Sequence, residues 1–192
     1  KEIIERLQYL EPTHELRTVF QYQNLMYMTA GYLVGEIAES SWEEFVQQEI
    51  FNPLEMRHSN FSVEESQKAD EFALPYQEKD DKIEKLPFCN VDVSGPAGSI
   101  NSNVADMANW LLLHLNQGKY GEKQIISPSN LKEIYSPQSV VTKTLEYNEL
   151  FYYCYGLGWF TSAYRGHHLI QHSGNIDGFT ERNSTRLKSR HF

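Results

Sequence analysis

Along the chain, the hydrophobic pattern changes from a helical repeat to a strand-like one, and this change favours folds that combine helices with a sheet. In residues 1–11 and 24–39, apolar side chains recur at three- and four-residue steps, which is typical of helices with one buried face. After Pro137, residues 152–160 and 167–171 are rich in aromatic and β-branched side chains. We predict two strands there, joined by a turn that contains a glycine.

Local capping signals support the helical part of this pattern. Ser41 and Glu44 form a capping box, in which the serine hydroxyl accepts a hydrogen bond from a helical N–H and the glutamate reaches back. They predict a further helix directly after the helix of residues 24–39. Within that helix, Gly31 and Gly35 are one turn apart, so another segment of the chain can approach it closely.

The middle of the chain carries fewer signals of regular structure. Residues 60–92 are polar and interrupted by prolines, and the charged run 79–85 is expected to be a solvated loop. The small residues of segment 94–100 predict a turn. Ser102 or Asn103 is expected to cap the helix that follows.

Composition and charge disfavour several classes of partner. The chain has 192 residues, 40% of them hydrophobic, so it is long and apolar enough to bury a core. The formal net charge of −9 is unfavourable for nucleic-acid binding, which needs a basic surface. No apolar run is long enough to cross a membrane. Cys89 and Cys154 lack the spacing of a zinc site, and we expect two buried free thiols, with a single disulfide as the alternative.

Two short motifs contain residues suited to acyl-transfer chemistry. The first is Tyr22-Gln23-Asn24, and the second, far along the chain, is His172-Ser173-Gly174. A phenol with a pKa near ~10 acts as a base at neutral pH only where a neighbouring cation stabilises its phenolate. An asparagine amide both donates and accepts hydrogen bonds, and a histidine changes charge near neutral pH. Each motif is weak alone, so the inference depends on their order.

In this order, the motifs resemble the second and third motifs of the serine hydrolases that share the penicillin-binding-protein fold. The likeness is greatest to the class C β-lactamases and D-alanyl-D-alanine carboxypeptidases, with their esterase and peptidase relatives. In this family the second motif reads Tyr-x-Asn, and the third reads Lys-Thr-Gly or, in many esterases and peptidases, His-x-Gly. The turn Pro53-Leu54-Glu55-Met56, the segment 94–100 and the stretch Tyr155-Gly156-Leu157-Gly158-Trp159 are further matches, although Glu55 replaces the family's usual glycine.

The resemblance covers Ile4 to Thr180 and implies an α/β fold of the α+β type, the β-lactamase and transpeptidase fold, in which a helical lobe joins an antiparallel sheet flanked by helices. We expect residues 1–120 to form part of the helical lobe and residues 121–180 part of the α/β lobe. Residues 181–192 are polar where the family would continue as an apolar strand. We interpret them as an atypical tail, produced by truncation, a frame change or a vector, and expect a domain that is incomplete at both ends.

The resemblance also assigns the candidate catalytic residues. Tyr22 would be the base or proton relay, and Asn24 would hold the acyl-side amide of the substrate. His172 would hydrogen-bond to the tyrosine oxygen or bind a carboxylate of the substrate. Because histidine titrates near neutral pH, its help would be weaker and more pH-dependent than that of the family's lysine.

The three residues that follow are the candidate substrate-binding residues. Ser173 would be a secondary hydroxyl donor, and Gly174 would let the substrate backbone lie close to the strand. The N–H of Asn175 would be one oxyanion donor. No cofactor is implied. A metal site is the weaker interpretation, because His168 and His172 share a strand face but no third ligand is placed near them.

The family's first motif, Ser-x-x-Lys, carries the nucleophilic serine and precedes the other two motifs. This chain has no such motif before Tyr22. The segment Ser129-Asn130-Leu131-Lys132 fits the pattern, but it follows Tyr22 and lies at a proline-marked helix start. We interpret it as a chance match.

The leading hypothesis is therefore a β-lactamase-type serine hydrolase, which cleaves an amide or ester through a serine acyl-enzyme. Its nucleophile lies outside this chain, so the chain alone is expected to be inactive. The alternative is a non-catalytic binding or regulatory module, or a degenerate fragment, that keeps the cleft. The expected partners are small-molecule or peptide substrates: β-lactams, D-amino-acid peptides or esters. These 192 residues contain no signal peptide, but Lys1 does not resemble a native start, so the sequence leaves compartment and oligomeric state open, although the family is mostly periplasmic or extracellular.

Overall fold

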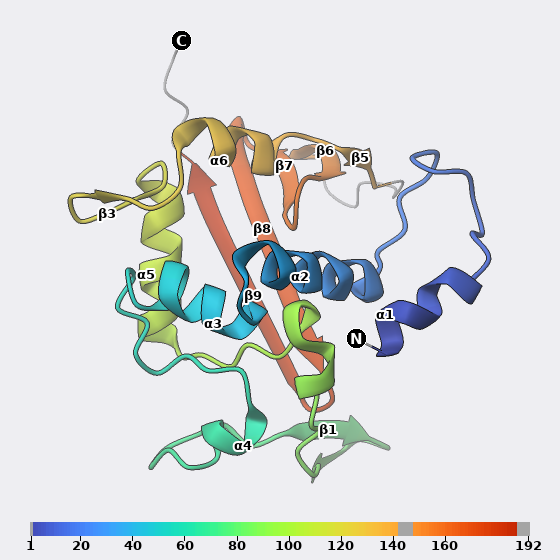
Figure 1. Ribbon diagram of the computed structural model, residues 1–192, viewed down its shortest axis with the longest axis vertical. Helices are drawn as coiled ribbons and strands as arrows, with labels where there is room; N and C mark the ends of the chain where they lie inside the picture. Colours follow the sequence, from blue (N-terminus) through green and yellow to red (C-terminus); the bar gives the residue numbers. More distant parts are fainter. Residues whose placement is uncertain (1, 142–147, 188–192) are drawn as a thin grey trace. The chain divides into compact units, whose positions relative to one another are not determined.

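The computed structural model describes residues 2–141 and 148–187, and the chain divides into two compact units (Figure 1). The helix-rich unit contains Lys1–Leu10, Gln23–Met107 and Gly174–Glu181. The sheet-rich unit contains Glu11–Tyr22, Ala108–Ser173 and the residues from Arg182 onward. The chain therefore passes between the two units more than once.

Short helices joined by turns make up most of the helix-rich unit, and one hairpin interrupts them. The helix expected in residues 1–11 is present, although its last turn is a 3-10 helix. In chain order the elements are α1 (Glu2–Arg6), η1 (Leu7–Tyr9), α2 (Asn24–Ala38), α3 (Trp42–Val46), the π-helix η2 (Gln47–Phe51), α4 (Val63–Ser66), β1 (Tyr76–Lys79), β2 (Lys82–Lys85), η3 (Asp92–Ala97) and α5 (Val104–Leu115), which continues into the sheet-rich unit.

The long helix α2 is set by signals at both of its ends. The side chain of Gln23 accepts a hydrogen bond from the Leu25 N–H at 3.0 Å, and the helix ends at Glu39, whose φ of 52° is left-handed. Gly31 and Gly35 are both buried. A Cβ added to Gly31 would lie 1.9 Å from Cγ of Pro96 in η3. The predicted close approach to this helix face is therefore confirmed, and it depends on the absence of a side chain at Gly31.

The capping box predicted at Ser41 is confirmed. The Glu44 N–H donates to the Ser41 hydroxyl at 3.1 Å, and the Ser41 N–H donates to the Glu44 carboxylate at 3.0 Å. The turn after η2 is also formed, and Glu55 adopts a left-handed φ of 56°, at the position where the family usually has glycine. Glu55 therefore adopts, without being a glycine, a backbone conformation that glycine adopts readily.

Asp106 ties the start of α5 to a segment far away in the sequence. Its carboxylate is buried and accepts hydrogen bonds from the His58 N–H and the Ser59 hydroxyl, both at 2.8 Å. The N–H of Asp106 donates to the side chain of Asn103 at 2.9 Å, so Asn103 is the residue that caps this helix. Charge-assisted bonds of this kind are among the stronger ones in proteins, and they stabilise the core of the helix-rich unit.

The polar middle of the chain contains more regular structure than the sequence predicts. The run 79–85, expected to be a loop, is largely part of an antiparallel hairpin in which Tyr76 pairs with Lys85. Asp80 and Asp81 form its turn with φ of 52° and 58°, a conformation that suits two-residue hairpins. The hairpin residues are exposed, as a solvated segment would be. Periodicity missed the hairpin because neither of its faces is buried.

The sheet-rich unit contains antiparallel strands. Five strands form one sheet in the order β5-β6-β7-β8-β9, in which the pairs from β5 to β8 are antiparallel, and β3 and β4 form a separate pair (Figure 1). β9 continues through the first part of the polar segment that follows Thr180. The elements are β3 (Lys119–Tyr120), β4 (Lys123–Gln124), α6 (Pro128–Tyr135), β5 (Ser139–Val140), β6 (Leu150–Tyr155), β7 (Phe160–Tyr164), β8 (His167–Ile176) and β9 (Phe179–Leu187).

Of the two strands predicted in the aromatic region, the second and the glycine-containing turn before it are confirmed, but the first is wrong, because its run is split into β6 and β7. The Gly156 N–H donates to the Trp159 carbonyl at 2.8 Å, and Gly158 has a φ of 82°, so the chain reverses there. A Cβ on Gly156 would lie 2.4 Å from the Ile134 carbonyl oxygen. This close approach requires glycine, and it depends on packing that periodicity does not contain.

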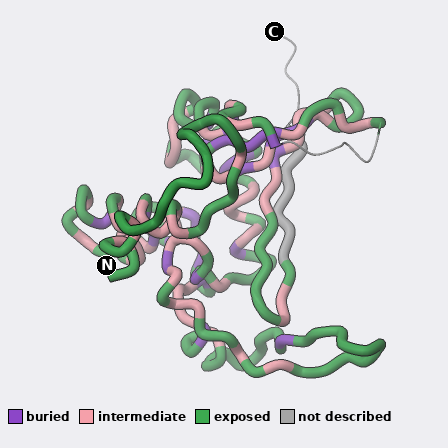
Figure 2. The backbone as a smooth tube through the Cα atoms, turned by 90° about the vertical axis from the view of Figure 1, so that its right-hand side faces the viewer, coloured by how far each residue is buried: buried purple, intermediate pink, exposed green. Residues whose placement is uncertain are grey.

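The core of the sheet-rich unit lies between α6 and the sheet. Leu131, Tyr135, Trp159 and Ile170 are all buried and pack together. Elsewhere buried residues occur only in short stretches between exposed ones (Figure 2). Burying such apolar side chains contributes about 1.5–3 kcal/mol each, so this cluster is a major source of stability for the unit.

The structure also answers two questions that composition raised. Both cysteines are free; Cys154 is buried but Cys89 is exposed, so the expectation of two buried thiols is wrong for Cys89. Within residues 2–141 and 148–187, no helix combines the length and the apolar character needed to span a bilayer.

Candidate functional site

The sheet-rich unit brings Tyr22 of the second motif and His172 of the third motif together. The rings of Tyr22 and His172 are in contact, with centroids 5.9 Å apart and planes inclined at 39°. Tyr22 ends the segment Glu11–Tyr22, and His172 lies on β8. Paired hydrogen bonds of 2.9 and 3.1 Å between the side chains of Thr13 and Gln21 hold that segment together just before Tyr22. Two residues far apart in the sequence thus lie with their rings in contact.

Tyr22 and His172 belong to a group of ring side chains that also contains Phe20, Tyr155 and Phe160, and we call this group the aromatic cluster. Tyr155 packs edge-on against Phe160 at 4.7 Å and against Tyr22 at 6.1 Å. Phe20 lies 5.3 Å from Tyr155, and Phe160 lies 5.5 Å from His172. Such ring pairs contribute roughly 0.5–1.5 kcal/mol each beyond area burial. They hold Tyr22 in place although 49% of that residue is exposed.

Both ring nitrogens of His172 have partners. Nδ1 lies 2.8 Å from the carbonyl oxygen of Ser173, and Nε2 lies 3.1 Å from the hydroxyl oxygen of Tyr155. Burial lowers the pKa of the His172 imidazole below its ordinary value, and the bond to the Ser173 carbonyl opposes that effect. His172 is therefore uncharged at neutral pH, unlike the lysine of the related motif.

The remaining predicted site residues lie on the elements that continue from these two motifs. Asn24 is the first residue of α2 and is exposed. Ser173, Gly174 and Asn175 are exposed on β8. The side-chain oxygen of Asn175 accepts a hydrogen bond from the Thr180 hydroxyl at 3.2 Å, which links β8 to the start of β9. Asn24, Gly174 and Asn175 belong to the helix-rich unit, whereas Tyr22, His172 and Ser173 belong to the sheet-rich unit.

Ser129, the serine that fits Ser-x-x-Lys, has a structural place at the start of α6. Ser127 caps this helix by accepting a hydrogen bond from the Asn130 N–H at 3.1 Å. The hydroxyls of Ser127 and Ser129 are 3.0 Å apart and share a hydrogen bond. Pro128 occupies the first turn, where its missing N–H is tolerated. The local sequence is thus that of a helix start.

A second histidine on β8 also faces a hydroxyl group. Nε2 of His168 lies 2.6 Å from the hydroxyl of the buried Thr161 on β7, and burial lowers the pKa of this imidazole. Among the residues described, no group of three or more His, Cys, Asp or Glu side chains is placed to hold a metal ion. His168 therefore serves the packing of the sheet.

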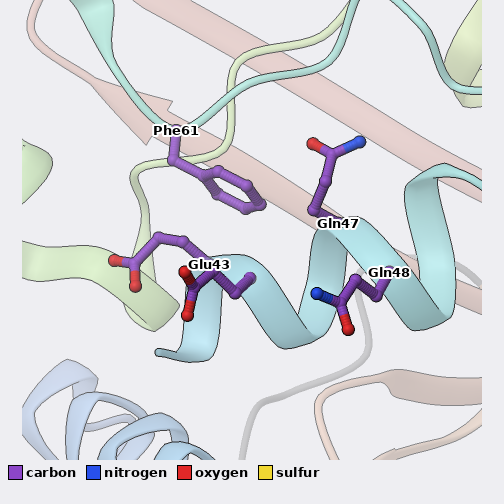
Figure 3. A pocket seen from close by; sticks show the side chains of 5 residues that line it. Glu43, Gln47, Gln48 and Phe61 are labelled. Atoms are coloured by element: carbon purple, nitrogen blue, oxygen red, sulfur yellow. The ribbon is translucent and has the colours of Figure 1, made fainter. Parts of the chain in front are cut away.

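The helix-rich unit contains a recess of about 270 Å³ that includes none of the motif residues (Figure 3). Glu44 is already engaged there, because the hydrogen bond from the Ser41 N–H holds the pKa of its carboxyl below the ordinary range. The recess offers carboxylates and amides but no nucleophile–base pair, so it does not compete as an active site. It is lined by Glu43, Glu44, Gln47, Gln48 and Phe61.

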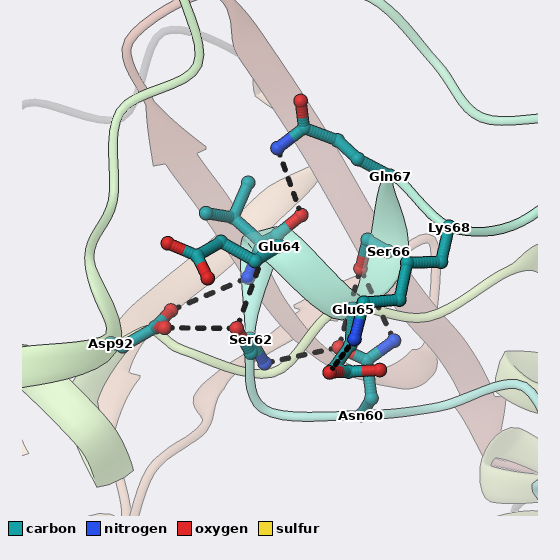
Figure 4. A network of polar contacts seen from close by, with 9 residues as sticks. Asn60, Ser62, Glu64, Glu65, Ser66, Gln67, Lys68 and Asp92 are labelled. Atoms are coloured by element: carbon teal, nitrogen blue, oxygen red, sulfur yellow. Dashed lines mark hydrogen bonds and ion pairs between the residues drawn. The ribbon is translucent and has the colours of Figure 1, made fainter.

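A polar network around α4 also has a structural role (Figure 4). The Ser62 hydroxyl and the Val63 N–H donate to the Asp92 carboxylate at 3.0 and 3.3 Å. The side chain of Asn60 accepts from the Ser62 N–H at 3.0 Å. Asp92 thus fixes the start of α4 to η3, as a carboxylate near a helix N-terminus does.

Sequence reasoning missed two residues of the sheet-rich unit that matter for its chemistry. Tyr155 was noted only as part of a matching stretch, and His114 was not singled out. The signal for Tyr155 is its place beside the glycine that ends β6, where its ring turns towards the aromatic cluster. His114 gives no sequence signal, because its 2% exposure results from packing against Trp110, Tyr135 and Trp159.

Comparison with known proteins adds three findings. The family model described as Beta-lactamase matches residues 1–187, past Thr180, where the resemblance read from the sequence ended. The unguisins hydrolase ungD' of Aspergillus campestris (strain IBT 28561) is 27% identical over 182 residues, which is 93% of this chain and 33% of that protein. The chain thus spans about a third of the length of the curated relatives it matches.

Two solved structures are similar in fold. The octameric penicillin-binding protein homologue from Pyrococcus abyssi matches with a TM-score of 0.76 at 21% identity, over 91% of this chain and 37% of that one. The D-stereospecific amidohydrolase from Streptomyces sp. matches with a TM-score of 0.73 at 20% identity, over 92% of this chain and 49% of that one.

Proposed function

Since the chain belongs to the beta-lactamase family, we propose that it supplies part of the active site of a serine hydrolase that cleaves an amide or ester through a serine acyl-enzyme. The family assignment made from the motifs is confirmed by the match to residues 1–187, and the α+β fold by the likeness to the two solved structures. The observation that carries the proposal is the ring contact between Tyr22 and His172, which joins the second and third motifs.

In the proposed reaction, a serine of a Ser-x-x-Lys motif outside this chain attacks the carbonyl carbon of the substrate. The serine proton passes to the Tyr22 oxygen, with the lysine of that motif holding the phenolate, while the carbonyl electron pair moves onto oxygen. When the carbonyl re-forms, the bond to the leaving group breaks and Tyr22 returns the proton to that group. Water then releases the acyl group from the serine by the same steps.

The other motif residues support this sequence of steps. Asn24 holds the acyl-side amide of the substrate with its carboxamide. The N–H of Asn175 is one donor to the oxyanion, and Gly174 leaves room for the substrate backbone beside β8. Ser173 offers a further hydroxyl. Because His172 is uncharged, it orients the Tyr22 ring and does not act as a cation.

The substrate class that we propose first is an amide formed by a D-amino acid. The similar fold of a D-stereospecific amidohydrolase supports this choice. An uncharged His172 adds support, because a β-lactam carboxylate would be better matched by a permanent cation. Esters and β-lactams are the comparison substrates.

Covalent labelling tests the proposal. The longer protein that contains this chain should gain the mass of one fluorophosphonate group, on the serine of a Ser-x-x-Lys motif that lies before Tyr22. The 192-residue chain alone should gain no mass under the same conditions. An adduct on Ser129 would show that the nucleophile lies within this chain. Absence of any adduct on the longer protein, together with retained binding of a D-amino-acid amide, would identify it as a binding module instead.

A further inference from the structure

We propose that Tyr155 is a positioning residue: its hydroxyl holds the His172 imidazole in one tautomer and in one orientation against Tyr22. The inference rests on the proposed function, because it concerns the same site. It adds a residue that lies outside the three sequence motifs. Its starting observation is the 3.1 Å contact between the Tyr155 hydroxyl and Nε2 of His172.

The tautomer follows from the chemistry of the two partners of His172. The Ser173 carbonyl oxygen can only accept a hydrogen bond, so we assign the ring hydrogen to Nδ1, which lies 2.8 Å from it. Nε2 then carries the lone pair and accepts from the Tyr155 hydroxyl, which can donate. A free histidine side chain favours the opposite tautomer, with hydrogen on Nε2. The two bonds together therefore impose the less common form.

Tyr155 is itself held rigidly, as a positioning residue must be. Only 7% of the residue is exposed, and its ring packs against Phe160 at 4.7 Å and Phe20 at 5.3 Å. Its backbone is fixed at the end of β6, where its carbonyl accepts from the Gln138 N–H at 2.8 Å. The hydroxyl is thus presented to His172 from a frame that has little freedom to move.

The consequence for Tyr22 is geometric. With both nitrogens bound, the imidazole cannot rotate without breaking a hydrogen bond, so its ring stays 5.9 Å from the Tyr22 ring. Without the Tyr155 hydroxyl, Nε2 loses its donor, and His172 is free to exchange tautomers and turn. Because a proton relay needs its atoms in place to within a fraction of an ångström, this freedom lowers the rate of the chemical step.

The chain offers a matched control four residues away on the same strand. His168 and His172 lie on one face of β8, and each has Nε2 bound to a hydroxyl, from Thr161 and Tyr155 respectively. Tyr155→Phe and Thr161→Val each remove one such hydroxyl and keep most of the side-chain volume. Only the first touches the histidine that contacts Tyr22.

The test measures histidine tautomers by nitrogen-15 NMR on this chain, and turnover of a D-amino-acid amide by the longer protein. Wild-type His172 should carry its hydrogen on Nδ1. Tyr155→Phe should add the Nε2–H form and lower kcat roughly tenfold to a hundredfold with little change in KM. Thr161→Val should leave the His172 signals and kcat unchanged.

Each result has a separate meaning. Hydrogen on Nε2 in the wild-type protein overturns the inference without any variant, as does an unchanged tautomer in Tyr155→Phe. A changed tautomer with unchanged kcat overturns the positioning role. If the wild-type protein turns over no amide, ester or β-lactam, the proposed function fails, and the NMR result still decides whether Tyr155 fixes His172.

Discussion

Two hydrogen-bonded histidine–tyrosine pairs lie in the described part of the sheet-rich unit, and they differ in almost everything except composition. His114 and Tyr135 meet in the core, where Nδ1 of the histidine is hydrogen-bonded to the phenol. His172 and Tyr155 meet in the aromatic cluster, where the bond uses Nε2 instead. His114 is 2% exposed, whereas His172 is only half-buried. The same two side chains thus serve two different purposes.

In the core pair, burial decides the chemistry. It lowers the pKa of His114 to about 4 and raises the pKa of the Tyr135 phenol above its ordinary value. The rings of Trp110 and Trp159 lie 4.3 and 4.8 Å from His114. Nε2 of His114 is buried and has no hydrogen-bond partner within the described part of the chain. His114 is therefore uncharged across the neutral range and acts as a packing residue.

In the aromatic cluster, burial is incomplete and the surroundings are arranged differently. Both nitrogens of His172 are satisfied, and its ring contacts a half-exposed tyrosine. On the proposal made above, the core pair contributes stability, whereas the pair of His172 and Tyr155 fixes the orientation of His172 against Tyr22. The following predictions test this contrast.

The largest expected effect is on turnover when the relay is removed. In the longer protein, Tyr22→Phe should lower kcat about 100- to 10,000-fold, because the proton relay is lost while the ring contacts remain. Tyr152→Phe, at an exposed position on β6, should leave kcat unchanged. Steady-state kinetics with circular dichroism as the folding control measures both. Equal activity of Tyr22→Phe and the wild type would remove Tyr22 from the mechanism.

The next effect is a pH dependence of stability that arises from the core pair. The pKa of His114 is about 4 in the folded protein and about 6.5 when unfolded, so the unfolded chain binds more protons between these values. Acidification from pH 6.5 to 4 should therefore lower the free energy of unfolding, by about 3 kcal/mol from this group. Urea unfolding should show the slope in the wild type and a shallower slope in His114→Phe, where His168 and His172, whose pKa values burial also lowers, still contribute.

The smallest effect separates the two phenols. Tyr135→Phe should lower the free energy of unfolding by about 1–3 kcal/mol, because both nitrogens of the buried His114 would then lack partners. Tyr155→Phe should lower it less, since water can reach the half-buried His172. Urea unfolding at neutral pH compares the two variants. A larger loss of unfolding free energy in Tyr155→Phe than in Tyr135→Phe would mean that the phenol in the aromatic cluster contributes more to stability than the phenol in the core.

Features governed by neighbouring residues could be predicted from the sequence. The capping box at Ser41 and the helix α2 depend on a few adjacent side chains, and both were predicted correctly. The split of β6 from β7 was not, because it depends on Gly156 lying against the Ile134 carbonyl. The hairpin at Asp80 and Asp81 was not predicted either, because both of its faces are exposed and its sequence therefore lacks the alternation of apolar and polar residues that marks a strand.

The candidate site likewise contains residues that the sequence identified and residues that it did not. Tyr22 and His172 were found through the resemblance, and the structure places their rings in contact. The roles of Asn24, Ser173, Gly174 and Asn175 stay predictions. Tyr155 and His114 were missed because their importance depends on which ring nitrogen meets which hydroxyl, and only packing of distant segments determines that.

The most direct test of the central claim compares the two phenols by the rate of active-site labelling. A fluorophosphonate probe is added to the longer protein as wild type, Tyr155→Phe and Tyr135→Phe, and the mass increase is followed with time. We expect the pair of His172 and Tyr155 to orient the site beside Tyr22, and the pair of His114 and Tyr135 only to stabilise the fold. Tyr155→Phe should then be labelled at least roughly tenfold more slowly than the wild type. Tyr135→Phe, measured where it is fully folded, then labels at the wild-type rate. Equal rates for the two variants would contradict the distinction between the pairs.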